Sequence, residues 1–255
     1  MRRALVLAVT LAGLPAAATA HVAPSIDDNN RYLKLTPLGD RVRLAYTVFF
    51  GEVPGSQTRP TIDADHDGAI SDVEAQAFGT KLAADVAAAL DITVDRTPYK
   101  VIWAEVVVGM GSPDVRAGSF SVDLVTYVCL PTARGHHELQ LRDKFRVTRP
   151  GETEVKIEDS FGITIERAHI GPANDSSHDF RFIGPGGPLS DDGIDLAFTA
   201  SDTAPLGDAS CAAAAKAARN LPTGLVVGAA AILGFIMAAV LTLVRRRQRR
   251  ASVRN

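Results

Sequence analysis

The stretch "RYLKLTPLGDRVRLAYTVFF", residues 31–50, alternates apolar and polar side chains on both sides of a Leu-Gly-Asp turn. In its second half, Val42, Leu44, Tyr46 and Val48 fall on one face. Successive side chains of a strand point to opposite faces, so this alternation predicts a hairpin of a half-buried sheet.

The residues after the hairpin predict one helix and a series of short strands. In an alanine-rich stretch, Phe78, Leu82, Val86 and Leu90 recur every four residues, which indicates an amphipathic helix over 72–90. We therefore expect a mainly β (α+β) fold: an antiparallel β-sandwich-like ectodomain with one inserted helix. The further expected strands, separated by Gly, Pro and Asp clusters, are 92–95, 99–108, 117–129, 136–147, 153–157, 161–169, 178–183 and 193–199.

The N-terminus predicts export. Arg2 and Arg3 precede a short apolar run and an A-x-A site, which together are typical of a removed secretory signal over residues 1–20. Cleavage after this segment leaves His21 as the first residue of an extracytoplasmic domain over 21–199.

The C-terminus predicts a membrane anchor. Residues 221–244 carry no charge, and at about 1.5 Å per residue they are long enough for one transmembrane helix. The arginine-rich tail 245–255 belongs in the cytoplasm by the positive-inside rule. We expect a single-pass protein of the bacterial inner membrane, with residues 200–220 as a stalk and the N-terminal domain outside.

Charge is distributed unevenly along the chain. All 29 acidic residues lie between the expected signal and the expected tail, whereas eight of the 27 basic residues lie within those two segments. The part between them therefore holds 19 basic and 29 acidic residues, a net charge near −10. Such a charge favours cations as ligands and argues against nucleic acid as a partner.

Two cysteines, Cys129 and Cys211, both fall in the part expected outside the cytoplasm. An oxidising compartment favours a disulfide between them, which would tie the stalk back onto the domain. Their separation is unlike the spacing of zinc ligands.

Residues 63–74, "DADHDGAISDVE", match the full D-x-[DN]-x-[DN]-G-x₅-E pattern of a calcium-binding loop. An acidic turn that opens a helix is the alternative, but a capping box needs only Ser71 and Glu74. Three aspartates within five residues repel one another unless a cation neutralises them. Gly68 stands at the sharp turn, and the expected calcium ligands are Asp63, Asp65, Asp67, the carbonyl of Ala69, Ser71 and Glu74.

This loop and the helix after it resemble the EF-hand family. Pro54, Gly55 and Pro60 argue against a long entering helix, and no second loop is present in the sequence to pair with. The stretch is therefore similar to the loop-plus-exit-helix variants of secreted bacterial proteins. One unpaired loop of this kind implies a dissociation constant of roughly 10⁻⁴ to 10⁻³ M.

A wider resemblance covers residues 21–105. "HVAPSIDDNNRYLKLTPLGDRVRLAYTVFFGEVP", followed by the acidic loop, a helix and further strands, is similar to the extracytoplasmic region that precedes HupE/UreJ-type nickel and cobalt permeases. A single expected span does not form such a permease body. The resemblance therefore implies a protein that acts beside a transporter.

Two other functions stay open. His21 offers its α-amine and imidazole to nickel, cobalt or copper, and either His136 or His137 could add a ligand, since neighbours on a strand face opposite ways. The second is an enzyme without a recognisable motif, because G-x-S-x-G, H-E-x-x-H and a phosphate-binding glycine loop are all missing from the sequence. We expect a calcium-binding accessory protein and not an enzyme.

Overall fold

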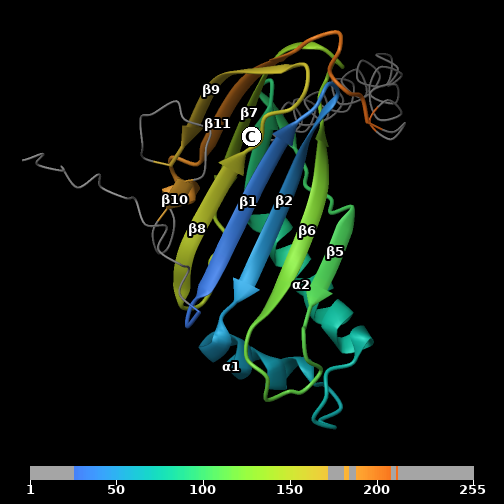
Figure 1. Ribbon diagram of the computed structural model, residues 1–255, viewed down its shortest axis with the longest axis vertical. Coiled ribbons are helices and arrows are strands. Elements are labelled where there is room, and N and C mark those ends of the chain that lie inside the picture. The colour runs from blue at the N-terminus through green and yellow to red at the C-terminus, as the bar shows by residue number, and fades with distance from the viewer. Residues whose placement is uncertain (1–25, 172–180, 184–187, 208–210, 212–255) are drawn as a thin grey trace, which may run out of the picture.

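The computed structural model of the chain describes residues 26–171, 181–183, 188–207 and 211. They form two β-sheets with two helices at one end (Figure 1). One sheet has the strand order β10-β8-β1-β2-β6-β5 and the other the order β4-β3-β7-β11-β9. The strands are β1 (Asn29–Pro37), β2 (Arg41–Phe50), β3 (Leu90–Val94), β4 (Thr97–Tyr99), β5 (Glu105–Gly109), β6 (Phe120–Cys129), β7 (Gly135–Asp143), β8 (Pro150–Ile157), β9 (Ile163–Ile170), β10 (Arg181–Ile183) and β11 (Ile194–Ala200).

The predicted hairpin is confirmed. β1 and β2 pair antiparallel from Asn30 opposite Phe49 to Pro37 opposite Val42. The N–H of Leu38 donates to the carbonyl of Arg41 at 2.8 Å and closes the turn. All four side chains of the predicted apolar face are buried, so the alternation in the sequence sets which face of this sheet meets the core.

One hydrophobic core joins the two sheets. Leu33 and Leu44 of the six-stranded sheet belong to the same cluster of buried side chains as Leu139 and Leu196 of the five-stranded sheet. Full burial of each such side chain stabilises the fold by about 1.5–3 kcal/mol. This shared core holds the two sheets against each other, and both helices contribute side chains to it.

The expected fold class is wrong in its strand pairing. β8 runs parallel to β1, with Leu33 opposite Val155, so the six-stranded sheet is mixed and not antiparallel. Parallel neighbours need a long crossover connection, and here the chain passes through both helices and β2 to β7 before it returns. Alternation within single strands carries no information about which distant strand becomes the neighbour.

The expected fold class is also wrong in its helix count. A first helix, α1 (Glu52–Ile62), precedes the acidic loop and contains Pro54, Gly55 and Pro60. Pro54 stands in the first turn, where a backbone N–H has no partner within the helix and the ring favours a helical φ. Pro60 stands near the last turn, so its missing N–H removes a hydrogen bond only at the end of the helix.

The second helix, α2 (Asp72–Ala89), is the predicted one, but its buried face agrees with the predicted face only in part: Val86 is buried, as is Leu90 just after the helix. Phe78 and Leu82 are only partly buried. A Cβ atom at Gly79 would lie 2.4 Å from a methyl of Val108, so α2 lies close against β5. The buried residues of α2 are mostly small: Ala75, Gly79, Ala83 and Val86.

No helix within the described ranges is long and apolar enough to cross a membrane. The longest of them, α2, has 18 residues and includes Asp72, Glu74, Lys81 and Asp85. The transmembrane helix of the expected fold class is therefore not among the helices found. The expected signal (1–20), span (221–244) and tail (245–255) lie outside the described residues.

Cys129 and Cys211 form the predicted disulfide, with their Cα atoms 5.5 Å apart. The chain just before Cys211 lies against the turn between β1 and β2. The N–H of Gly39 donates to the carbonyl of Pro205 at 2.8 Å, and the N–H of Gly207 donates to Asp40 Oδ1 at 3.0 Å. The first part of the expected stalk thus packs on the domain, whereas residues 208–210 and 212–220 lie outside the described residues.

Candidate calcium site

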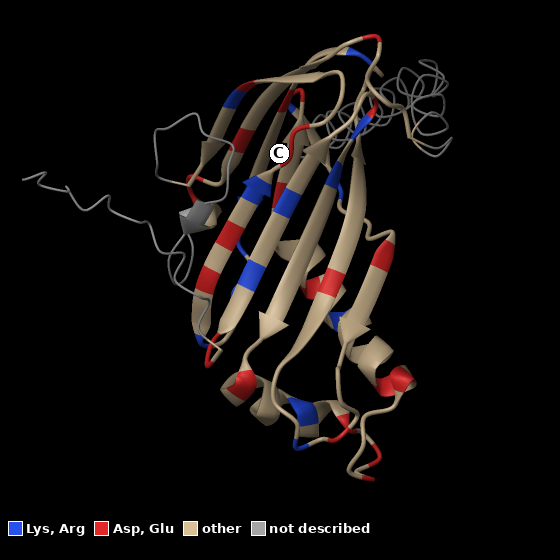
Figure 2. Cartoon of the chain, viewed as in Figure 1, with Lys and Arg blue, Asp and Glu red and all other residues tan. Residues whose placement is uncertain are grey.

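The acidic loop, residues 63–74, connects α1 to α2 at one end of the molecule (Figure 1). Acidic residues gather along this loop and around the beginning of α2 (Figure 2). α1 ends at Ile62 and the loop's last three residues form the first turn of α2, so the arrangement is helix, loop, helix. The sequence expectation of an exit helix alone is corrected by α1.

Three of the expected ligands converge. One carboxylate oxygen from each of Asp63, Asp65 and Asp67 can be chosen so that all three lie within 4.8 Å of one another. Calcium binds oxygen at about 2.3–2.6 Å, so oxygens on opposite sides of one ion are up to about 5 Å apart. The cluster therefore has the size and the oxygen donors of a calcium site. Among the described residues, no other group of three His, Cys, Asp or Glu side chains is this close.

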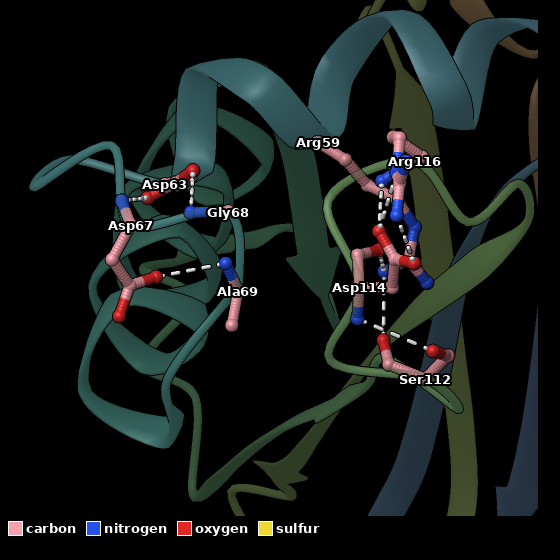
Figure 3. Close-up of polar contacts among 8 residues, drawn as sticks. All are labelled: Arg59, Asp63, Asp67, Gly68, Ala69, Ser112, Asp114 and Arg116. Atoms are coloured by element: carbon pink, nitrogen blue, oxygen red, sulfur yellow. Dashed lines mark hydrogen bonds and ion pairs between the residues drawn. The ribbon is translucent and has the colours of Figure 1, made fainter.

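Main-chain N–H groups of the loop orient these carboxylates. Asp63, the buried one of the three, accepts from the N–H of Asp67 at 3.2 Å and from the N–H of Gly68 at 3.1 Å (Figure 3). Gly68 has φ of +90°, a conformation that residues with a Cβ atom rarely adopt. His66 also has positive φ, at 59°. The turn thus wraps the main chain around the Asp63 carboxylate.

The carbonyl of Ala69 points away from the segment that contacts the loop. Ala69 forms an isolated antiparallel bridge with Asp114, in which its two neighbours make the hydrogen bonds. In such a bridge the central residue's own N–H and C=O point away from the partner strand. The N–H of Ala69 accordingly donates to Asp67 Oδ1 at 2.8 Å (Figure 3). The carbonyl on the same side is available as a fourth oxygen ligand.

Ser71 and Glu74 are engaged with each other. Glu74 Oε2 accepts from the N–H of Ser71 at 2.9 Å and from its hydroxyl at 2.8 Å, while Oε1 accepts from the N–H of Ala64 at 2.6 Å. The Ser71 N–H, then the Ser71 hydroxyl, then the Ala64 N–H lower the pKa of Glu74 to about 2. The carboxylate is thus ionised at neutral pH, and it is not part of the aspartate cluster. Each carboxylate oxygen has two lone pairs, so an oxygen that accepts one hydrogen bond can still bind an ion.

Two features beside the loop escaped sequence reasoning: Arg59, and the segment 110–119 that contacts the loop. This segment reads as a strand separator, "GMGSPD", and nothing in the residue pattern links it to residues 63–74. Its Asp114 carboxylate accepts from the N–H of Arg116 at 2.8 Å, and this bond is the main cause that lowers the pKa of Asp114. Asp114 also forms the bridge with Ala69, so this segment supports the loop in addition to the two helices.

The histidines do not gather into a site among the described residues. His136 and His137 point to opposite faces of β7, as predicted. The exposed His136 has Nδ1 3.0 Å from Glu166 Oε2, and the buried His137 has Nδ1 2.9 Å from Asp95 Oδ2. His21, the expected transition-metal ligand, lies outside the described residues.

Comparison with known proteins identifies no family. No family model matches the chain, and no curated protein matches it. Two solved chains match, one of them the crystal structure of an aminopeptidase N family protein from Idiomarina loihiensis. It is 10% identical with a TM-score of 0.26, and the match covers 68% of this chain but only 29% of that one. A likeness of this size indicates neither a shared fold nor a shared activity.

Proposed function

We propose that this chain is an exported calcium-binding protein that serves as a binding or accessory module. The observation that carries the proposal is the convergence of oxygens from Asp63, Asp65 and Asp67. The carbonyl of Ala69, which points away from the bridge with Asp114, is the proposed fourth ligand. All these donors are oxygens, the ligands that calcium prefers, whereas nickel, copper and zinc favour nitrogen and sulfur. Ser71 and Glu74 complete the proposed ligand set.

The disulfide supports the exported location. Cys129 and Cys211 are bridged, and such bonds persist in oxidising compartments outside the cytoplasm. A weak calcium site suits that location, because extracellular calcium modules bind with dissociation constants of roughly 10⁻⁴ to 10⁻³ M. The proposed site is therefore structural and not a cytoplasmic sensor.

Bound calcium would act by fixing the start of α2. The ligand Glu74 belongs to the first turn of α2, whose small residues lie against the sheet. An ion that binds only the folded chain adds about 2.7 kcal/mol to the free energy of unfolding at a hundredfold excess over its dissociation constant. Magnesium is smaller and loses its water reluctantly, so it should add less.

The test is thermal unfolding of the purified chain in calcium, in magnesium and in chelator. We expect the melting temperature to rise most in calcium. Trp103, the single tryptophan, donates from Nε1 to the carbonyl of Ala83 in α2 at 2.7 Å, so its fluorescence reports on the attachment of this helix.

Glu74→Gln should abolish the calcium-dependent rise in melting temperature, because it removes a charged ligand while Gln still suits the cap position. Asp72→Asn is the matched control, since it removes the same charge from the same helical turn without touching a proposed ligand. If the wild-type chain melts at one temperature in calcium and in chelator, and calorimetry detects no binding at millimolar calcium, the loop is only an acidic turn.

A further inference from the structure

Arg59 of α1 is a fully buried cation whose hydrogen bonds are complete. A guanidinium has five N–H donors in a planar fork and no acceptor. Here every acceptor is a main-chain carbonyl of one short segment, residues 110–119. Figure 3 shows two of these residues, Ser112 and Asp114, beside Arg59. Nε donates to Gly118 (2.9 Å), Nη1 to Ser112 (2.8 Å) and Asp114 (3.1 Å), and Nη2 to Met110 and to Ser119 (3.2 Å).

Residues 110–119, here named the support segment, therefore close around a cation that belongs to the chain itself. The segment joins β5 to β6, and the ring of Phe120 at its end lies 5.5 Å from the guanidinium carbon of Arg59. A buried charge is tolerated only where hydrogen bonds replace its hydration. Removal of Arg59 would likewise leave five carbonyls without this donor. The conformation of the support segment thus depends on Arg59.

The support segment is in turn hydrogen-bonded to the acidic loop. The N–H of Ile70 donates to the carbonyl of Pro113 at 2.7 Å, and the N–H of Val115 donates to the carbonyl of Gly68 at 3.2 Å. These two bonds flank Ala69 and direct its carbonyl away from the support segment. The direction of one proposed calcium ligand therefore depends on a segment that is organised by Arg59.

We propose that Arg59 is a positioning residue for calcium: through the support segment, it holds the acidic loop in its binding conformation before the ion arrives. This inference rests on the proposed function. A loop that is ordered before calcium binds loses less conformational entropy on binding, so its affinity for calcium is higher. By thermodynamic linkage, bound calcium stabilises the ordered support segment by the same free energy by which the ordered segment favours calcium binding.

The test measures calcium affinity of the full chain by calorimetry and hydrogen exchange of the Ile70 and Val115 amides. Arg59→Lys keeps the charge but offers three donors on a flexible stem in place of a planar fork of five. We expect its calcium Kd to rise roughly tenfold, which corresponds to about 1.4 kcal/mol. Both amides should also exchange faster, in chelator as well as in calcium.

Arg116→Gln is the matched control, because Arg116 belongs to the same segment but its side chain is 86% exposed. It should leave the calcium Kd and the exchange rates of both amides near wild type. Val115→Pro is a second variant, which removes the N–H that bonds Gly68 and leaves Arg59 in place. It should weaken calcium binding in the same direction as Arg59→Lys. If Arg59→Lys does not fold, unchanged binding by Val115→Pro still overturns the proposal, because the effect of Arg59 must pass through this contact.

The possible failures are distinguishable. If the wild type binds calcium and a folded Arg59→Lys or Val115→Pro chain binds it with the same Kd, Arg59 has no positioning role. If the wild type binds no calcium, the proposed function fails and this inference fails with it. In that case, exchange of the Ile70 and Val115 amides in chelator still shows whether the support segment depends on Arg59. Faster exchange in Arg59→Lys than in the wild type means that it does.

Discussion

Arg31 Nη1 lies 2.8 Å from Asp143 Oδ2, and the pair is buried between the two sheets. Arg31 comes from β1 of the six-stranded sheet and Asp143 from the end of β7 in the five-stranded sheet. The hydroxyl of Tyr46 donates to the same Asp143 oxygen at 2.8 Å, and Arg31 also donates to Thr153 Oγ1 at 2.9 Å. Burial raises the pKa of Asp143, while the charge of Arg31 opposes that rise. The pair therefore links the sheets by a charge interaction with little access to water.

Removal of Arg31 should be strongly destabilising. Arg31→Met leaves the Asp143 carboxylate buried without its cation, and we expect the free energy of unfolding to fall by about 3–5 kcal/mol. Urea unfolding at neutral pH measures the change. Lys34→Met is the surface comparison: its ion pair with Glu158 is partly exposed, so the loss should stay below about 1 kcal/mol.

The double variant Arg31→Met with Asp143→Leu separates charge from packing. Replacing both partners by apolar side chains removes the unpaired charge, so part of the lost stability should return. The buried hydroxyl of Tyr46 then loses its acceptor, which keeps the recovery incomplete. If the double variant is less stable than Arg31→Met alone, the ion pair is not what makes the single change costly.

Gly79→Ala should destabilise the chain although alanine favours helices. The added methyl would lie 2.4 Å from a Val108 methyl, and the branched valine side chain has little freedom to move away. Overpacking of this kind costs about 1–3 kcal/mol, whereas the gain in helix propensity is about 1 kcal/mol. We expect a net loss in urea unfolding and a change in Trp103 fluorescence as α2 shifts. Thr80→Ala, at the next and exposed position, should be neutral or stabilising; equal effects of the two changes would contradict close packing at Gly79.

Glu74 should make stability depend on pH in acid. Its pKa is lowered from 4.5 to about 2 in the folded chain, first by the N–H of Ser71. A lowered folded pKa means that the ionised carboxylate stabilises the fold above the unfolded pKa of 4.5, and that this contribution is lost as pH falls to about 2. Unfolding in calcium-free buffer should therefore show wild type and Glu74→Gln converging across this range. A stability difference that stays constant from neutral pH to pH 2 would contradict the hydrogen bonds assigned to Glu74.

The features predicted from sequence are those with a local signature. The hairpin at 31–50 is predictable because strand alternation has a period of two, and the Ser71–Glu74 capping box because its two residues stand three apart. The disulfide followed from the cysteine count. The three aspartates converge because one tight turn brings them together. In each case the residues that interact are close in sequence or few in number.

The features that escaped prediction have no such signature. α1 contains Pro54, Gly55 and Pro60, whose propensities oppose a helix. The helix tolerates these residues because they stand in its first and last turns. Periodicity favoured Phe78 and Leu82 as the buried face of α2, but the close approach of β5 selects small residues. Arg59 bonds only main-chain carbonyls, which every residue has, so the sequence cannot indicate its partners.

Loss of the disulfide should loosen the C-terminal part of the domain. The bridge joins Cys129 to Cys211 across a separation of 82 residues, and a cross-link of this span restricts the unfolded chain strongly. Cys129→Ala with Cys211→Ala should therefore lower the free energy of unfolding by about 2–4 kcal/mol. A reductant should lower the stability of the wild type by a similar amount and leave the double variant unchanged. Because Gly207 bonds Asp40 in the turn between β1 and β2, the amide of Gly207 should also exchange faster in the double variant. A wild-type chain that is insensitive to reductant while both thiols become accessible would show that the hydrogen bonds at the hairpin turn hold this segment without the bridge.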